Sequence, residues 1–394
     1  MRLVFLRPVT LLLTGLVALL AGCGGGAESG QAGTLSAQAA LGEKIFNDTS
    51  LSASGAQSCA TCHAADRGHG APNSLSAQPG GAALERQGSR SSPSIRYLAS
   101  NRAFYFAADG TPTGGFFWDG RAKSLQDQAG RPFLNPDEMA NGSRAEVILR
   151  LAAAAYVDEF RRVFGADIFS RTDDAYDRMT LALQQYQMES AEFAAFSSKY
   201  DEFLRGKASL TDAELRGLAF FDSPAKGNCA ACHPSARGAD GSLPLFTDFS
   251  YDALGVPRNP TLRANADPAF FDLGLCAREG GDLAARPDLC GAFKVPSLRN
   301  VGLRGSFFHN GRFTSLKEAL TFYVQRDTSP EKWYPLKADG SVEKFDDLPE
   351  AYRGNVNTSE APYNRRRGDA PALSDAEIDD LIAFLNTLTD GYAR

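Results

Sequence analysis

Two copies of the pattern Cys-x-x-Cys-His constrain this chain more than any other feature of its sequence. They are Cys59-Ala60-Thr61-Cys62-His63 and Cys229-Ala230-Ala231-Cys232-His233. The pattern is the attachment site of c-type haem, in which two thiols bind one porphyrin and the adjacent histidine binds its iron. A thioredoxin-like redox pair would need a βαβ context, and a zinc site would not explain a histidine after each cysteine pair. The sequence therefore predicts two covalently bound haems c, with His63 and His233 as iron ligands.

The three remaining cysteines are expected to have other roles. Cys276 and Cys290 bracket a short loop, and in an oxidising compartment we expect them to form a disulfide. A redox switch between the same two thiols is the alternative. Cys23 follows a leader that carries two arginines and a short apolar run, typical of a signal peptide. The end of this leader, Leu20-Ala21-Gly22-Cys23, resembles a bacterial lipobox, in which the cysteine becomes the lipidated N-terminus.

The N-terminal segment and the charge indicate where the protein acts. We expect residues 1–22 to be a signal peptide and residues 23–38 to be a flexible tether from a lipid-anchored Cys23. The alternative is a plain signal peptide cut nearby, which would leave an incidental cysteine. The expected location is the periplasm, at the membrane surface. The net charge of −6 argues against a nucleic-acid partner and favours a cationic one.

An internal duplication predicts two domains. Residues 41–48 lead into the first haem motif and residues 215–222 into the second, each as an amphipathic helix followed by a Gly- and Ser-containing loop. The two motifs lie about 170 residues apart. We therefore expect two cytochrome-c-like domains, a peroxidatic one over residues 39–206 and an electron-transfer one over residues 207–394.

The remaining local signals are mostly helical. Capping boxes are expected at Thr211, Ser315 and Ser374, each with a glutamate three residues later. Apolar periodicity predicts further helices over residues 145–164 and 176–204. Alternating strands are scarce, so the expected fold class is mainly α with long irregular loops.

The second haem cannot have a methionine ligand from its own domain, because the last methionine of the chain is Met188. The residues alone leave His309, Tyr323, a lysine or no ligand as alternatives, and a packed core tyrosine is the simplest role for Tyr323. A tyrosinate ligand would favour high oxidation states of iron.

Five further motifs follow one another along the chain. They are Leu51-Ser52-x-Ser54-Gly55-x-x-Ser58, Phe117-Trp118-Asp119-Gly120-Arg121-Ala122, Asn135-Pro136-x-Glu138-Met139, Pro296-Ser297-Leu298-Arg299-Asn300-Val301 and Phe308-His309-Asn310-Gly311. Together with the haem motifs they resemble the bacterial di-haem cytochrome c peroxidase family, which includes the MauG-type enzymes. The resemblance runs from about residue 40 to the C-terminus. It implies that peroxide binds at an open first haem and that a six-coordinate second haem stores or relays electrons.

The resemblance also implies roles for the residues around the first haem. Trp118 matches the family's tryptophan between the two haems, and Gln128, Pro132 and Glu138 match its distal pocket. Glu138 would move a proton from one peroxide oxygen to the other, and Gln128 would hydrogen-bond the bound oxygen.

Four other positions bear on the branch of the family. Tyr323 stands where ordinary members have a methionine ligand and MauG-type members have tyrosine, so the resemblance implies that it ligates the second iron. His309 then matches a structural histidine between the haems. Pro79 replaces the distal histidine of peroxidases that need prior reduction, and the mis-spaced His69 is interpreted as a loop residue. The first haem is therefore expected to be open without reductive activation.

Some positions depart from the family pattern. The inter-haem calcium of the family would lie near Ser91, Arg304 and Ser306, where an asparagine is lost and an arginine gained. Gly227 replaces a surface tryptophan that the methylamine-utilisation enzyme uses toward its protein substrate. The stretch over residues 322–335 resembles MauG relatives that oxidise a tryptophan on a copper-linked partner.

The leading hypothesis is a MauG-like periplasmic di-haem oxidoreductase. It would react with hydrogen peroxide and draw the oxidising equivalents from a protein side chain or a small donor. The alternative is a detoxifying cytochrome c peroxidase fed by a small cytochrome c or cupredoxin. A non-catalytic electron carrier with two saturated haems is a third reading, against which the retained pocket residues argue.

Overall fold

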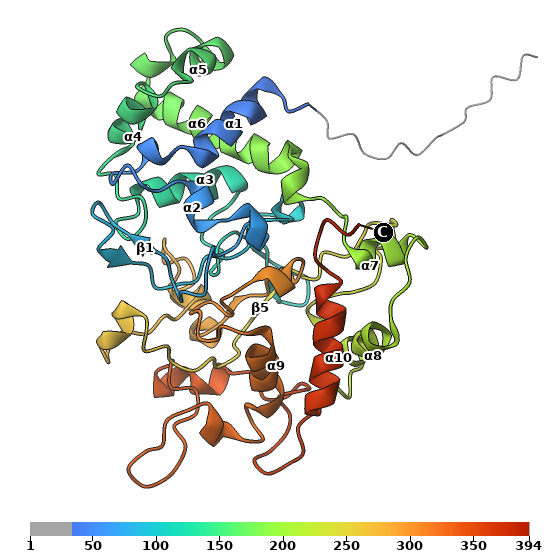
Figure 1. Cartoon of the computed structure of the whole chain (residues 1–394). Helices are drawn as coiled ribbons and strands as arrows, with labels where there is room; N and C mark the ends of the chain where they lie inside the picture. The colour runs from blue at the N-terminus through green and yellow to red at the C-terminus, as the bar shows by residue number, and fades with distance from the viewer. Residues whose placement is uncertain (1–33, 394) are drawn as a thin grey trace, which may run out of the picture. The chain divides into compact units, whose positions relative to one another are not determined.

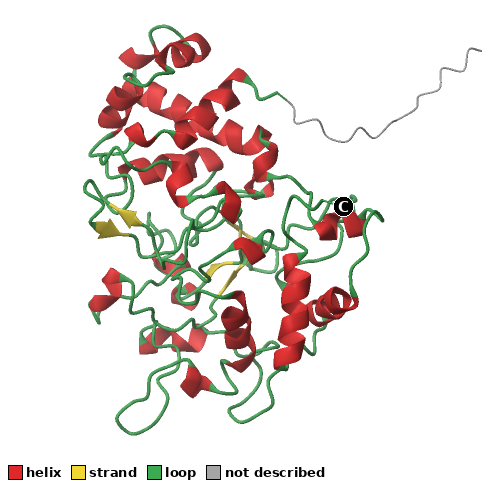
Figure 2. Ribbon diagram, viewed as in Figure 1, coloured by secondary structure: helices red, strands yellow, loops and turns green. Residues whose placement is uncertain are grey.

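Helices form most of the regular structure in the computed structural model, which describes residues 34–393 (Figures 1 and 2). The leader, Cys23 and most of the expected tether lie outside the described residues. The α-helices of the described part are α1 (Ala37–Asn47), α2 (Cys59–Cys62), α3 (Leu125–Leu134), α4 (Arg144–Leu151), α5 (Val157–Phe164), α6 (Thr172–Glu189), α7 (Lys199–Leu204), α8 (Asp212–Asp222), α9 (Leu316–Gln325) and α10 (Asp375–Asn386). A mainly α fold with long irregular loops is confirmed. In residues 34–393 no helix is both long and apolar enough to cross a bilayer.

The strands of the described residues are short and form three antiparallel pairs. They are β1 (Pro79–Gly80) with β2 (Arg86–Gln87), β3 (Tyr105–Phe106) with β4 (Pro112–Thr113), and β5 (Tyr251–Asp252) with β6 (Phe293–Lys294). Each strand has two residues, so these pairs pin loops together and do not build a layer of the fold.

The duplicated segments become matching helix crossings. Helix α1 packs on α6, and α8 packs on α10 (Figure 1). Each crossing depends on a glycine, because a Cβ on Gly42 would lie 2.0 Å from the Ala182 carbonyl oxygen and one on Gly217 would lie 2.1 Å from that of Asp380. Only glycine lets the two backbones approach so closely.

The described residues form two large hydrophobic cores, and along the sequence the change from one core to the other falls near residue 196. One contains side chains from Leu41 to Phe193, and the other contains side chains from Tyr200 to Leu388. Residues Thr34–Arg394 nevertheless form one unit by their backbone contacts. The division into two haem domains at residue 206 therefore stays a prediction.

Two of the expected helices are wrong in extent. The chain turns at residues 152–156, so residues 145–164 form α4 and α5. The turn buries Tyr156 and lets its hydroxyl donate to Asp48 at 2.7 Å. The second expected helix, residues 176–204, divides into α6 and α7 around a loop that buries Phe193 beside His69. In both places tertiary burial of one aromatic ring overrides local helix propensity.

The capping predictions differ in outcome. Thr211 with Glu214 and Ser374 with Glu377 form complete capping boxes at α8 and α10. At α9, Ser315 accepts from the Glu318 amide at 3.0 Å, which is half of the expected box.

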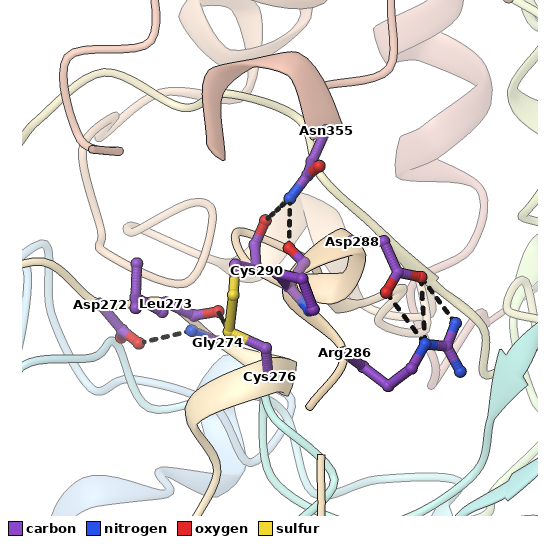
Figure 3. Close-up of a disulfide and its surroundings, with 9 residues drawn as sticks. Asp272, Leu273, Gly274, Cys276, Arg286, Asp288, Cys290 and Asn355 are labelled. Atoms are coloured by element: carbon purple, nitrogen blue, oxygen red, sulfur yellow. Dashed lines mark hydrogen bonds and ion pairs between the residues drawn. A yellow bond between two sulfur atoms is a disulfide. The ribbon is translucent and has the colours of Figure 1, made fainter. Parts of the chain in front are cut away.

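The disulfide between Cys276 and Cys290 is confirmed (Figure 3). It closes a loop that also contains the Arg286–Asp288 ion pair. The amide of Asn355 donates to the carbonyls of Pro287 and Cys290, which joins this loop to a distant part of the chain.

Candidate haem sites

The first Cys-x-x-Cys pair forms a single helical turn, α2. Its N-cap, Ser58, makes a capping box with Thr61, and the His63 amide donates to the Cys59 carbonyl at 2.9 Å. The Nδ1 atom of His63 lies 3.1 Å from the carbonyl oxygen of His69. Because a carbonyl can only accept, Nδ1 carries the proton and Nε2 keeps a free lone pair. His63 is therefore prepared as a neutral nitrogen ligand.

The second Cys-x-x-Cys pair has the same histidine orientation, although its turn, Cys229–Ala231, is a 3₁₀ helix. The His233 amide donates to Cys229 at 2.8 Å, and its Nδ1 lies 2.8 Å from the Phe246 carbonyl oxygen. Burial lowers the pKa of both His63 and His233 below the ordinary value, so both rings stay neutral. The predicted ligand pair is thus oriented in the same way at both motifs.

The four motif cysteines are half-buried thiols, and neither pair is joined as a disulfide. Burial, with smaller contributions from nearby negative groups, raises the pKa of each to about 12: Cys59, Cys62, Cys229 and Cys232. A redox-active pair needs a stabilised thiolate, which these surroundings disfavour. Covalent attachment of haem is the chemistry that the environment fits.

A cavity, here called the second cavity, lies against the second motif. Cys229, Cys232, His233 and Tyr323 line it together, among walls that include Leu298 and Leu320. The apolar walls and the histidine with its free Nε2 fit a haem. Gly227 also lines it, and a Cβ there would lie 3.0 Å from Cys229 Sγ, so this position is too close to the motif for a larger residue.

Tyr323 comes from α9 and His309 from the loop before it, and both line the second cavity. The Tyr323 ring packs against Phe308 at 5.4 Å and Tyr363 at 5.9 Å between centroids. Burial, together with nearby negative groups, raises the pKa of Tyr323 above its ordinary value. His309 stacks on Phe293 at 3.5 Å, and burial lowers its pKa to about 3.

A smaller cavity, here called the first cavity, contains Gln128 and Phe117 in its wall. The backbone of Pro93, which also lines it, acts on the pKa of the His63 ring, so this cavity adjoins the first motif. Trp118 and the segment 294–297 line both cavities and form their shared wall. The structure therefore brings Gln128, Trp118 and Tyr323 to one continuous region.

Pro132 and Glu138 lie close to this region without lining the first cavity. Pro132 is inside α3, one turn after Gln128, and its carbonyl accepts from the Met139 amide at 3.1 Å. Glu138 lies near enough to the first motif to raise the pKa of Cys62. Burial raises the pKa of Glu138 itself, although Arg121 opposes this effect. A raised pKa makes a carboxylate a stronger base than an exposed one, which suits a group that takes up and returns a proton.

Trp118 is held from both ends. Its indole nitrogen donates to the Ser91 carbonyl at 2.8 Å, and its carbonyl accepts from the Lys294 amide at 2.8 Å. The Ser91 amide in turn donates to the His309 carbonyl at 2.7 Å, and the Ser91 and Ser306 hydroxyls share a hydrogen bond of 2.8 Å. Two of the three residues expected around an inter-haem calcium, Ser91 and Ser306, thus bond to each other, and residues 34–393 contain no cluster of three His, Cys, Asp or Glu suited to a metal.

His69 lies in a turn, as the sequence predicts, but it is buried and has a role that sequence reasoning missed. Its carbonyl orients His63, its ring packs on Phe193 at 4.3 Å, and its Nδ1 accepts from Arg96 at 3.0 Å. Burial lowers its pKa to about 3. Pro79 is exposed in β1.

Lys294 is the second residue that sequence reasoning missed. It is 9% exposed, lines both cavities and donates to the Tyr251 hydroxyl at 2.6 Å and to the Gly114 carbonyl. Burial lowers its pKa to about 7. A lysine one residue after a phenylalanine carries no local signal of this burial.

Two oriented Cys-x-x-Cys-His turns, each beside a cavity in a mainly helical chain, define a c-type cytochrome with two haem sites. The family model for di-haem cytochrome c peroxidase matches residues 36–209. The chain is 38% identical over 363 residues to the methylamine utilization protein MauG of Paracoccus denitrificans, covering 90% of this chain and 89% of the relative. It is 32% identical to cytochrome c551 peroxidase of Nitrosomonas europaea, covering 72% and 71%. The crystal structure of the dihaem peroxidase BthA from Burkholderia thailandensis superimposes with a TM-score of 0.82 at 40% identity, covering 90% and 86%.

The chain therefore belongs to the di-haem cytochrome c peroxidase family, as its motifs predict. It is a peroxide-dependent oxidoreductase, and two c-type haems are its cofactors.

Proposed function

We propose that this protein is a MauG-like oxidoreductase in which Tyr323 and His233 would both bind the iron of the second haem, and His63 would be the one protein residue to bind the iron of the first. The observation that carries the proposal is the position of Tyr323, which lines the same cavity as Cys229, Cys232 and His233. Bound there, the haem iron supplies the electrons that reduce peroxide. An anionic oxygen ligand stabilises its higher oxidation states. Burial raises the pKa of Tyr323, so its hydroxyl stays protonated in the protein alone. It would bind as tyrosinate because the positive charge of the haem iron would take the place of its proton.

At the first haem, Gln128 and Glu138 act on peroxide. Gln128 lines the first cavity and is 8% exposed, so its amide is held in place to bind the peroxide oxygens. Glu138 takes the proton from the near oxygen and returns it to the far oxygen, which leaves as water. Pro132 has no amide hydrogen to donate to the Gln128 carbonyl one turn earlier, and its own carbonyl, in the last turn of α3, accepts from the Met139 amide and positions the Glu138–Met139 turn.

Trp118 conducts electrons between the two sites. Its ring lies in the shared wall, and its two hydrogen bonds leave it one orientation. The oxidising equivalents end on a protein side chain or a small donor outside the chain. Each hydrophobic core forms the body of one haem domain, and a lipidated Cys23 anchors the protein in the periplasm.

The first test mixes the as-isolated diferric protein with one equivalent of hydrogen peroxide and follows the Soret and near-infrared bands. We expect a rapid Soret change with a near-infrared charge-resonance band, which reports two electronically coupled haems. Tyr323→Met should retain both haems and lose this band. Tyr334→Phe is the matched control, because Tyr334 is buried in the same core, donates to the Gly255 carbonyl, and does not line the cavity.

A protein that does not react until one haem is reduced would overturn the MauG-like proposal. It would support the second candidate, a detoxifying peroxidase fed by a small cytochrome c or cupredoxin. The net charge of −6 favours a basic donor of this kind. Fast peroxide-dependent oxidation of a reduced basic cytochrome c that slows steeply with added salt would show it.

A further inference from the structure

Arg304 is a half-buried arginine between the two haem sites, with two of its guanidinium nitrogens fully enclosed. It follows the 3₁₀ turn Val301–Leu303 and lines the second cavity. Its charge also contributes to the lowered pKa of His63, the ligand of the first haem. One guanidinium group thus borders the second site and acts electrostatically on the first.

This guanidinium has no counterion among the described residues. Its Nε and Nη2 atoms are buried and find no hydrogen-bond partner within residues 34–393. Burial lowers the pKa of Arg304 to about 10, with no carboxylate acting in the other direction. The three buried arginines of the described residues each face a carboxylate: Arg278 with Asp282, Arg299 with Asp201 and Arg326 with Asp327.

Guanidinium nitrogens that are buried without a hydrogen-bond partner are costly for a protein to hold. The cavity that Arg304 lines therefore has to receive an anion. A c-type haem attached at Cys229 and Cys232 carries two propionates, which are carboxylates suited to the planar fork of an arginine. Because Arg304 and the second haem motif line the same cavity, the haem is the group that brings this anion.

We propose that Arg304 binds a propionate of the second haem, and that its fixed positive charge takes the place of the inter-haem calcium of the family. The positions expected around calcium do not fit an ion. The Ser91 and Ser306 hydroxyls bond to each other at 2.8 Å, and a guanidinium lies two residues from Ser306, where it would repel a divalent cation. This inference requires only the two haems, and it stands whether or not Tyr323 is a ligand.

Two measurements on the holoprotein test the proposal. The first is the calcium content after equilibration with calcium chloride and desalting, with the absorption spectrum recorded before and after EGTA. We expect far less than one calcium per chain and no spectral change. Stoichiometric calcium, or a spectrum that EGTA alters, would overturn the replacement of calcium by Arg304.

The second measurement is the midpoint potential of each haem in Arg304→Met, Arg304→Lys and the control Arg67→Met. Arg67 is exposed and its side chain contacts the Leu303 carbonyl at 3.5 Å and the exposed Asp66 carboxylate at 4.0 Å, so its variant loses the same charge nearby without touching the cavity. Loss of a buried positive charge favours ferric iron, so Arg304→Met should lower the potential of the second haem. Arg304→Lys should stay nearer the wild-type value, and Arg67→Met should match it. Equal potentials in Arg304→Met and Arg67→Met would refute the pairing. If Arg304→Met does not load haem, the Arg304→Lys variant decides the question. An Arg304→Lys protein that loads haem and keeps the wild-type potential of the second haem supports the pairing. An Arg304→Lys protein in which that potential is lowered refutes it.

Discussion

The buried ion pair between Arg299 and Asp201 provides the strongest stability prediction. The two side chains are 1% and 0% exposed, and the guanidinium donates to both carboxylate oxygens at 2.8 and 2.9 Å. The same guanidinium lies 4.6 Å from the ring centres of Tyr97 and Phe196. The ion pair therefore connects the Tyr97 and Phe196 rings to the hydrophobic core that contains residues from Tyr200 to Leu388.

Arg299→Met keeps most of the side-chain volume and removes the charge. It deletes the two charge-assisted hydrogen bonds to Asp201, worth about 1.5–3 kcal/mol each, together with the one to the Pro244 carbonyl, and leaves Asp201 with its bonds from Ser198. Breaking a buried pair by removing one partner costs about 3–5 kcal/mol. The two estimates agree, so we expect the free energy of unfolding to fall by about 4 kcal/mol. Equilibrium urea unfolding of the holoprotein, followed by circular dichroism and the Soret band, measures this loss.

Two further variants make the reasoning refutable. Arg216→Met removes a bidentate pair of similar geometry, with Asp380, that solvent screens, so its effect should be much smaller. Adding Asp201→Asn to Arg299→Met removes the stranded charge and should recover part of the loss. A double variant that is less stable than Arg299→Met, or an Arg299→Met that matches Arg216→Met, would refute the account.

The pair also predicts the acid behaviour of the protein. Burial raises the pKa of Asp201, but hydrogen bonds from Arg299 and Ser198 outweigh this and hold it below its ordinary value. The stabilisation is therefore complete above about pH 4, the pKa in the unfolded chain, and is lost as the pH falls through the lower folded value. In Arg299→Met the acid limb of the stability curve should move to higher pH.

Three other predictions concern parts of the fold that support the sites. Gly217→Ala should lower the free energy of unfolding by about 1–3 kcal/mol, because a carbonyl oxygen of α10 lies 2.1 Å from the added Cβ. Gly354→Ala is the control, since its added Cβ has no atom within 4 Å, and thermal unfolding should show no comparable loss. Burial lowers the pKa of Lys294 to about 7, so between about pH 7 and pH 10 the unfolded chain holds a proton on this lysine that the folded protein has lost, and the free energy of unfolding of the wild type should rise with pH over that range. Urea unfolding at several pH values should show a shallower rise in Lys294→Met. Replacing Cys276 and Cys290 by serine should cost about 3 kcal/mol in urea unfolding, and adding a reductant to the wild type should reproduce the loss without affecting the double variant further.

The sequence by itself determined what depends on residues close together in the chain. The Cys-x-x-Cys-His turns, the capping boxes at Thr211 and Ser374, and the disulfide of a short loop all follow from local spacing, and the structure contains each of them. Family membership was also readable, because several such motifs occur in a fixed order. These features need few long-range contacts, so their chemistry is visible in a few consecutive residues.

Only the tertiary structure decided which distant residues share a cavity or lack a partner. The shared wall of Trp118 and residues 294–297, and the unpaired guanidinium of Arg304, depend on segments far apart in the chain. The breaks in the helices over residues 145–164 and 176–204 have the same origin, since burying Tyr156 and Phe193 outweighs helix propensity. Burial and pairing are properties of the packed chain, where the partners of a charge are set by neighbours that no local pattern identifies.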